Sequence, residues 1–421
     1  MVNWIRENRV PFCDSLFFAA YGIYLVVSIL NVSFLMASLS WTLFKVILAG
    51  VMGLVLVREA LLREWDLRSG LILFGAVLFC LFQWNLKVFF IPGALLVFTA
   101  RRIPFERIAR FTIPVCAVTL VAVILCAELG LCTNMVTQSD GRIRDYLGFR
   151  YVLYPGIIMT NLTLLAVYLR QDRLKWWEGL GLLLASFLVY LATDSRMNFL
   201  LAVLALLLAV FLKRKPGFLE HRPALRKASA FSFLFWALIS IPLMLFFTKD
   251  SFILHTLDNL LSNRLYLANF DYKVLGIHLF GSPDFQMTGS GLDLDGKVYA
   301  GYYNYLDNLY VQILIVYGVV LFVLALALIT HVMWKLADQD KRGYLLGIFV
   351  LLALQAFIQD SFWFLWYNTF LFVLADVWFG KARTEEPENP APPPVPRARK
   401  TRERSPEEKL IEQIAREVRH L

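Results

Sequence analysis

Three polar residues mark the start of an apolar run in the sequence YLDNLYVQILIVYG, which extends from Tyr305 to Gly318. Asp307 has a carboxylate that could accept a proton from a hydroxyl group, or could instead cap the first turn of a helix by accepting from free backbone N–H groups. Asn308 and Gln312 are four residues apart and therefore share one face of a helix. The pattern predicts either a helix cap with two nearby amides or the polar rim of a reaction chamber in a membrane.

Arginines form a second group of residues that could do chemistry. The stretch GRIRDYLGFRY places Arg142, Arg144 and Arg150 within nine residues. Clustered guanidinium groups suit planar, bidentate recognition of phosphate or carboxylate. The alternative interpretation is that these arginines are surface charges offset by Asp140 and Asp145. The first interpretation predicts an anion-binding site, and the second predicts only a solvated, charged surface.

A further arginine lies in the short connection Thr193-Asp194-Ser195-Arg196 between two apolar runs. So short a connection predicts a tight turn at the membrane surface, with Ser195 capping the next helix. A lone Arg196 in such a turn could simply extend its long side chain towards lipid headgroups. Alternatively, Asp194 and Arg196 lie at the mouth of a helical bundle and belong to a site.

A long polar segment precedes the stretch described first. Polar residues from His255 to Arg264 recur at mixed three- and four-residue spacings among apolar ones, which predicts an amphipathic helix on or near the outer membrane surface. His255 and His278 could move a proton near neutral pH. Asp293 and Asp295 offer fewer oxygen ligands than a hard cation needs, so no metal is expected.

Apolar helices must position these residues, because 59% of the 421 residues are hydrophobic and 17% are charged. Globular proteins have about 45–50% apolar and about 25% charged residues. We therefore expect an all-α, polytopic membrane protein, a helical bundle in which twelve apolar runs cross about 30 Å of hydrocarbon. The runs lie near 14–36, 40–57, 70–84, 86–100, 111–129, 152–169, 177–193, 197–212, 229–248, 306–330, 344–360 and 362–380.

The distribution of charge indicates the orientation of these spans. With a cytoplasmic N-terminus, most of the 41 Lys and Arg residues fall in segments that lie in the cytoplasm, in agreement with the positive-inside rule. Both termini are then cytoplasmic, and the two long external segments are about 130–151 and, between spans nine and ten, about 249–305. Arg6 and Arg9 precede the first run without a small-residue cleavage site, so the run is expected to stay as an anchor. The basic residues are too scattered to form a nucleic-acid-binding surface.

Two domains are expected: a transmembrane domain over 1–380 and a cytoplasmic, Pro-rich and basic tail over 381–421. The Pro-rich part of the tail should be extended and solvated. From Ser405 the pattern predicts a capped helix. The tail could bind anionic lipid headgroups or a cytoplasmic partner, or it could be a solvated extension.

Four stretches occur in a recognisable order: GRIRDYLGFRYVLYPG, TDSRMNFLLAVLALLLAVF, LSNRLYLANFDYKVLGIHLFG and YLDNLYVQILIVYG. Together they resemble the Wzy-type polysaccharide polymerases of the O-antigen polymerase and ligase superfamily of bacterial membranes. The resemblance covers about 140–380, whereas 1–130 is similar only as a membrane scaffold. Many relatives carry a histidine shortly after the Gly-Phe turn, and this chain has none there, so a general base must come from elsewhere or be unnecessary. The residues that match the family motifs are Arg144, Gly148, Phe149, Ser195, Arg196, Arg264, Asp307, Asn308 and Tyr310.

The resemblance implies a glycosyltransferase of the bacterial plasma membrane with its active site facing outside. Such an enzyme moves a growing glycan from undecaprenyl diphosphate to another lipid-linked repeat unit, with inversion at the anomeric carbon and without a metal or cofactor. Its partners would be the lipid-linked oligosaccharide, membrane lipids and polysaccharide assembly proteins such as a chain-length regulator. The expected catalytic residues are Asp307, Arg196 and Arg264, and the expected diphosphate- or glycan-binding residues are Arg142, Arg144, Arg150, Asn308, Tyr310, His255 and His278.

Two other functions fit the same architecture. A ligase of the same superfamily would share the donor and transfer finished glycan to a lipid or protein acceptor. A flippase for lipid-linked oligosaccharides, or a small-solute transporter, would also have many spans, but transporters usually place ionisable coupling residues inside their spans, where this sequence has few.

Overall fold

The computed structural model describes residues 9–62, 70, 74, 87–139, 141–282, 285, 287–289, 291–297 and 304–379. Internal contacts divide the chain into two units, Met1–Gly380 and Lys381–Leu421. The second unit, which holds the expected cytoplasmic tail, lies outside the described residues, as does almost all of the expected span at 70–84.

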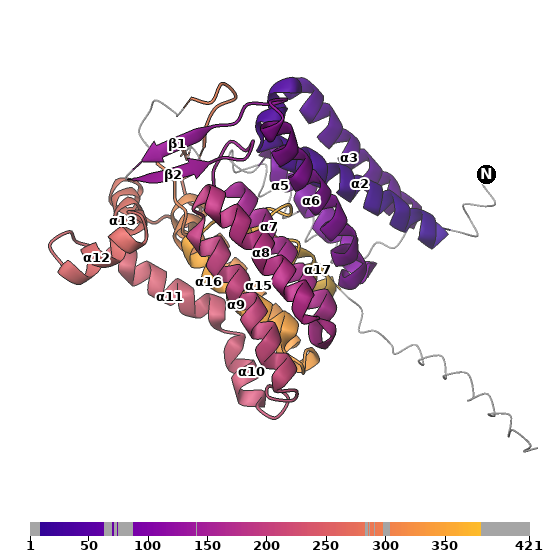
Figure 1. Ribbon diagram of the computed structural model, residues 1–421. Helices are drawn as coiled ribbons and strands as arrows, with labels where there is room; N and C mark the ends of the chain where they lie inside the picture. The colour runs from indigo at the N-terminus through magenta and orange to yellow at the C-terminus, as the bar shows by residue number, and fades with distance from the viewer. Residues whose placement is uncertain are drawn as a thin grey trace, which may run out of the picture. The chain divides into compact units, whose positions relative to one another are not determined.

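The first unit is mostly helical, as the sequence predicts (Figure 1). Its α-helices are α2 (Arg9–Asn31), α3 (Trp41–Leu62), α5 (Lys87–Thr99), α6 (Phe105–Glu128), α7 (Tyr154–Arg170), α8 (Trp176–Thr193), α9 (Arg196–Arg214), α10 (Pro223–Ser229), α11 (Ser232–Leu245), α12 (Phe252–Leu260), α13 (Arg264–Leu275), α14 (Leu309–Gln312), α15 (Gly318–Gln339), α16 (Tyr344–Ile358) and α17 (Leu371–Phe379).

Several of these helices have the length and composition of membrane spans. Five described helices are long and apolar enough, and a sixth is added if α10 and α11, bent by 46° at their junction, count as one. The five are Val10–Asn31, Phe105–Glu128, Trp176–Thr193, Arg196–Arg214 and Leu309–Gln339. They indicate a membrane protein, while the expected number of twelve spans stays a prediction.

Helix α8 shows most directly why lipid suits this fold. Leu180, Leu184, Leu188 and Leu191 lie three or four residues apart and are each more than half exposed, so they form one apolar stripe along the helix. Such a stripe would be unfavourable in water. Lipid chains are as apolar as leucine and solvate the stripe without that penalty.

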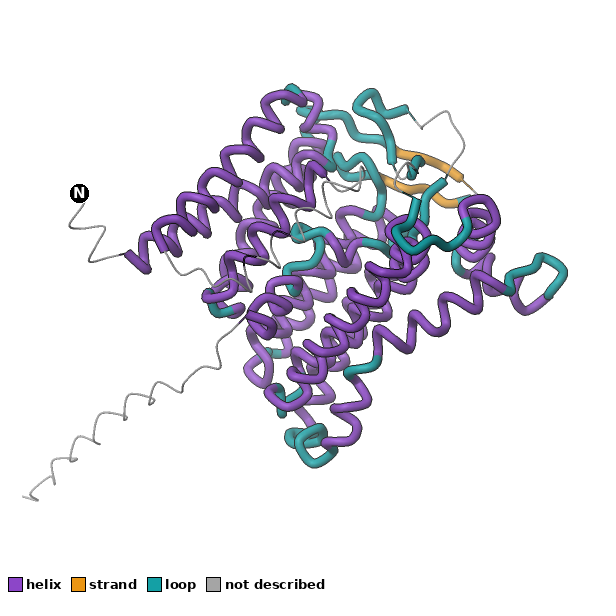
Figure 2. Tube along the Cα trace, turned by 180° about the vertical axis from the view of Figure 1, so that it is seen from behind, coloured by secondary structure: helices purple, strands orange, loops and turns teal. Residues whose placement is uncertain are grey.

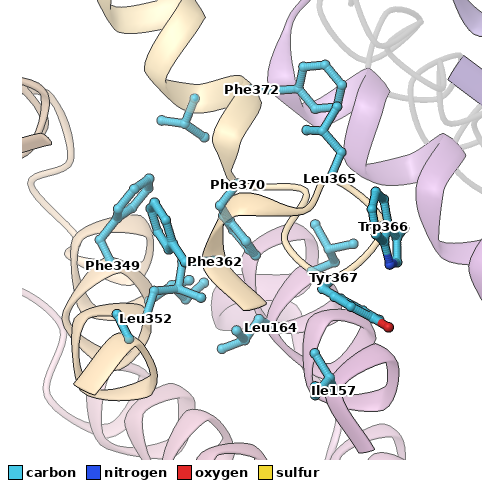
Figure 3. Packing of buried hydrophobic residues seen from close by; sticks show 14 of the residues in the cluster. Ile157, Leu164, Phe349, Leu352, Phe362, Leu365, Trp366, Tyr367, Phe370 and Phe372 are labelled. Atoms are coloured by element: carbon cyan, nitrogen blue, oxygen red, sulfur yellow. The ribbon is translucent and has the colours of Figure 1, made fainter. Parts of the chain in front are cut away.

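Aromatic side chains fill the centre of the bundle near the connection between α16 and α17 (Figure 3). The ring of Phe370 lies 6.3 Å from that of Phe349 and 5.3 Å from that of Phe105, measured between centroids. Beside it, the buried Asn161 of α7 donates to Thr369 Oγ1 at 2.9 Å and accepts from the Thr369 backbone N at 3.2 Å. The connection is thus fixed by both packing and paired polar groups, which buried amides require.

One β-hairpin departs from the all-α expectation. Strands β1 (Val136–Ser139) and β2 (Arg142–Asp145) are antiparallel, with Val136 opposite Asp145, and lie at one end of the helices together with loop segments (Figure 2). Gly141, in the two-residue connection, has φ of +73°. The sequence Asp140-Gly141 favours such tight hairpins, a signal that the helix-based interpretation passed over.

The apolar run that follows Asn308 is broken near Gly318. A π-helical turn spans Ile313–Tyr317, and Gly318 then adopts φ of +94° before α15 continues. The segment 278–282 fills the break. Ser282 N donates to Val316 O at 3.0 Å, while the carbonyls of His278 and Leu279 accept from the first backbone N–H groups of α15 at 3.0 and 3.1 Å.

We expect Gly318→Ala to destabilise the protein. A Cβ at Gly318 would overlap the backbone of Gly281, and the positive φ adds strain, so the loss should be on the order of 3 kcal/mol. Thermal unfolding of the purified protein in detergent measures it. Gly50→Ala is the matched control, because a Cβ there meets nothing within 4 Å. Equal melting temperatures for the two variants would contradict the docking of segment 278–282.

Candidate functional site

A cavity of about 690 Å³ contains the polar residues that open the broken span. Asp307 and Gln312 line it together with two further acids, Asp293 and Asp360, and we call it the carboxylate cavity. Several aromatic side chains form its walls. They include Tyr151, Tyr154, Trp363, Trp366 and Tyr367.

Asp307 forms an ion pair with Arg264. Arg264 Nε donates to Asp307 Oδ2 at 3.1 Å, and the two side chains are 17% and 12% exposed. This pair brings together two residues that the sequence predicts as catalytic, from α13 and from the segment before α14. A mostly buried carboxylate is thereby balanced by a nearby cation, as buried charges require.

The chain turns sharply to place Arg264. The expected amphipathic helix is divided here, because α12 ends at Leu260 and both Ser262 and Asn263 have left-handed backbone conformations, with φ of 59° and 64°. Asp258 then accepts from the backbone N of Leu265 and Tyr266 at 2.9 and 3.1 Å. Arg264 is the first residue of α13, where the helix dipole repels a cation. Such an unfavourable arrangement, held by a strained turn, is typical of a functional site.

Asn308, and not Asp307, caps α14. The side-chain oxygen of Asn308 accepts from the backbone N of Tyr310 and Val311 at 3.0 and 3.2 Å, and its Nδ2 donates to Ser240 Oγ at 3.0 Å. The prediction that Asp307 is a helix cap is therefore wrong. Because Asn308 satisfies the first turn, the Asp307 carboxylate is available for Arg264.

Asp360 is the site residue that the sequence analysis missed. It follows α16, and its Oδ2 accepts from the Tyr305 hydroxyl at 2.6 Å and from Gln312 Nε2 at 3.1 Å. Gln312 Nε2 also donates to the Leu306 carbonyl at 3.0 Å. The available signal was an acid at the end of an apolar run, which is a functional hypothesis by default.

The carboxyl groups of Asp307 and Asp360 differ in their electrostatics. Burial raises the pKa of Asp307 above its ordinary value, and the charge and hydrogen bond of Arg264 oppose that shift. Burial raises the pKa of Asp360 to about 6, and the nearby charge of Asp307 adds to the shift, while the hydrogen bonds from Tyr305 and Gln312 oppose it. Asp360 therefore changes protonation closer to neutral pH than an ordinary aspartate does.

Three arginines gather around one acid, Asp194. Arg196 Nε lies 3.1 Å from Asp194 Oδ1, while Arg142 Nε and an Arg144 terminal nitrogen lie 3.6 and 3.8 Å from Oδ2. We call these four residues the arginine cluster. Three guanidinium groups against one carboxylate give a net charge of +2, and the arginines are 32–61% exposed, so they are accessible to an anion.

The hairpin explains how two of these arginines act together. Successive side chains of a strand point to opposite faces, so Arg142 and Arg144 of β2 share the face that meets Asp194, whereas Ile143 between them is 66% exposed. Asp194 itself ends α8 with φ of 49°.

The first turn of α7 connects the two groups. Tyr154 lines the carboxylate cavity, and Gly156, two residues later, packs so closely on Ser195 that a Cβ would overlap its hydroxyl. Ser195 precedes Arg196, and its Oγ pairs with Thr193 Oγ1 at 2.8 Å. The turn that carries Asp194 and Arg196 is thus packed against the helix that forms one wall of the cavity.

Other expected site residues have mainly structural contacts. Arg150 lines the cavity, but its guanidinium donates to the carbonyls of Leu292 and Asn31 at 2.9 and 3.4 Å, so it ties the segment 291–297 to the end of α2. Tyr310 is 1% exposed, and its hydroxyl donates to the Ala353 carbonyl at 2.9 Å. A substrate contact by either residue stays a prediction.

The two histidines lie in different surroundings. His255 of α12 lines a second cavity of about 470 Å³ together with Lys249 and, at its boundary, Asp307. His278 is exposed, and its Nε2 lies 2.7 Å from the Leu275 carbonyl, at the end of α13. Of the two, only His255 shares a described cavity with Asp307.

No protein-family model, characterised protein or solved structure matches the chain. The fold and the site define a helical membrane protein whose bundle carries a carboxylate-lined, aromatic cavity and, packed against one wall of it, an arginine cluster of net positive charge.

We expect the stability effect of Arg264→Ala to depend on pH. Without Arg264 the pKa of Asp307 rises further above its value in the unfolded chain, so the folded protein loses stability as pH rises through that value. The difference in melting temperature from the wild type should therefore be larger at pH 8 than at pH 5. A pH-independent difference would show that Arg264 contributes packing alone. Lys273→Ala, an exposed residue of the same helix, is the control.

Proposed function

We propose that the chain is a membrane glycosyltransferase that polymerises undecaprenyl-diphosphate-linked oligosaccharide repeat units into a cell-surface polysaccharide such as capsule, exopolysaccharide or O-antigen. The observation that carries the proposal is the gathering of Arg142, Arg144 and Arg196 around Asp194 with a net charge of +2. The Wzy-type resemblance of the four motif stretches supports it, because three of those stretches contribute residues to the two groups described above.

The arginine cluster suits the donor's leaving group. Diphosphate gains negative charge as its bond to the sugar breaks, and fixed guanidinium groups stabilise that charge through charge-assisted hydrogen bonds. Since the distances of Arg142 and Arg144 from Asp194 exceed a normal hydrogen bond, these side chains can turn to a phosphate oxygen without giving up a short contact.

The carboxylate cavity suits the sugars. Aromatic side chains offer flat apolar faces with polar edges, and Tyr154, Trp363, Trp366 and Tyr367 line this cavity together with three acids, Asp293, Asp307 and Asp360. The donor is anchored in lipid, which accounts for a site at the end of apolar helices. In this proposal the protein has twelve spans with both termini in the cytoplasm, lies in the bacterial plasma membrane, and builds the polymer on the outer face.

Deletion of the gene tests the function. We expect the surface glycan of the deletion strain to lose its long chains and to retain a single repeat unit, as judged by gel banding, because repeat units are still made and exported. Expression of the intact gene should restore the ladder. Wild-type chain lengths in the deletion strain would contradict the proposal, and finished chains that remain on their lipid carrier would indicate the related ligase reaction.

Substitutions of two arginines test the site. We expect Arg196→Ala and Arg264→Ala each to reduce polymer by at least about 100-fold at unchanged membrane protein levels, because each removes a fixed cation from the site. Lysine at either position should restore little, since an ammonium group lacks the planar, bidentate fork. Arg214→Ala, at the opposite end of α9 from Arg196, is the control. Normal polymer from both alanine variants would show that the arginines only contact headgroups.

A further inference from the structure

Three acids line the carboxylate cavity, Asp293, Asp307 and Asp360. Asp293 is exposed, and its Oδ1 accepts from the backbone N of Asp295 and Lys297 at 3.0 and 2.7 Å, so Asp307 and Asp360 are the two candidates for a general base. We propose that Asp360, and not Asp307, accepts the proton of the acceptor hydroxyl, and that Asp307 positions Arg264. This inference rests on the proposed function and names a residue that lies outside the four motif stretches.

The Asp307 carboxylate is already engaged in an ion pair. Its Oδ2 accepts from Arg264 Nε at 3.1 Å, and both side chains are mostly buried. The guanidinium group favours the charged form of Asp307 and so opposes the rise in pKa that burial causes. Protonation of Asp307 would also leave Arg264 as an uncompensated, largely buried cation, which is costly.

Asp360 has the opposite surroundings. Its two side-chain partners are the Tyr305 hydroxyl and the Gln312 amide, which are neutral donors. Among the described residues no Lys, Arg or His forms an ion pair with Asp360. Both donors bind Oδ2, and a hydrogen bond from the Asp360 backbone also reaches the carboxylate, so the group is held in one orientation; in the proposed step Oδ1 receives the incoming proton. When Asp360 takes up a proton, its one negative charge is neutralised.

Several titratable groups surround Asp360 in the cavity. The other acids that line the cavity are Asp293 and Asp307, and the neighbouring hydroxyls are those of Tyr154, Tyr305 and Tyr367. The cations that line the same cavity are Arg150 and Lys297. Ordinary Tyr, Lys and Arg side chains titrate far above pH 8. Burial raises the pKa of Asp360 to about 6, so above that pH its carboxylate is mostly charged and able to accept a proton.

The proposed step balances as follows. The acceptor hydroxyl oxygen forms a bond to the anomeric carbon of the donor sugar, while the bond between that carbon and the diphosphate oxygen breaks and its electron pair stays on the diphosphate. The hydroxyl proton moves to Asp360 Oδ1 and is later released to water. The products are the extended lipid-linked glycan and undecaprenyl diphosphate.

Three isosteric variants test this assignment in the deletion strain. Asp360→Asn and Asp307→Asn each remove one charge, and Asp338→Asn, in the last turns of α15 and 64% exposed, is the control. Glycan chain length and membrane protein level are measured in media between pH 5 and pH 8. We expect Asp360→Asn to reduce polymer by about 100-fold or more, as loss of a general base does. Asp307→Asn should retain measurable polymer, and its output should still fall on the acid side of pH 6.

Thermal unfolding of the purified variants gives a readout that is independent of activity. Because the pKa of Asp360 is raised on folding, its contribution to stability is present at low pH and is lost as pH rises through about 6. Asp360→Asn should therefore raise the melting temperature at pH 8 more than at pH 5. A residue needed only for structure would instead lower it at both values.

Each contrary result has a distinct meaning. Wild-type polymer from Asp360→Asn would overturn the assignment of the base. If Asp307→Asn also made no polymer, the result would instead favour Asp307 as the base. A lower melting temperature of Asp360→Asn at both pH values would also overturn the assignment to Asp360, because the residue would then act through the fold. An unchanged glycan in the deletion strain itself would instead overturn the proposed function.

Discussion

Backbone hydrogen bonding in apolar surroundings is the constraint on which the candidate site depends. A helix in lipid satisfies its own backbone groups, so any break has to be filled by protein. Here the break before Gly318 is filled by the segment 278–282, whose backbone bonds to residues on both sides of it. With that segment docked, residues 304–308 are not helical and carry Asp307 to the cavity. The polar chemistry of the site is therefore a consequence of where the span is interrupted.

The positive and the negative groups of the candidate site differ in their exposure to solvent. The arginine cluster has a net charge of +2 and is partly exposed, whereas Asp307 and Asp360 lie within an aromatic cavity. The first turn of α7 packs against the turn that holds Arg196 on one side and lines the cavity on the other. Under the proposed function, the partly exposed arginine cluster binds the diphosphate, while the more buried carboxyl groups meet the sugar hydroxyls. Proton transfer at the buried groups is more sensitive to nearby charges.

Properties that depend on composition or on adjacent residues could be predicted from the sequence. The apolar runs predicted the helical character, and the arginine-bearing turns stood out because they place charges between apolar runs. Asp360 could not be found in this way, because its partners Tyr305 and Gln312 are 55 and 48 residues away in the chain. The sequence also could not show that Asn308 caps the helix in place of Asp307, because both residue types cap helices equally well. Only the ion pair with Arg264 distinguishes them.

The hairpin imposes a rule on how this part of the chain can change in length. Arg142 and Arg144 meet Asp194 because they share one face of β2, and Ile143 occupies the other. An insertion or deletion of one residue next to β2 would exchange the two faces and turn both arginines away, whereas a change of two residues would keep them aligned. Gene variants that differ in length at this point should therefore differ by even numbers of codons. Surface loops have no such restriction on their length.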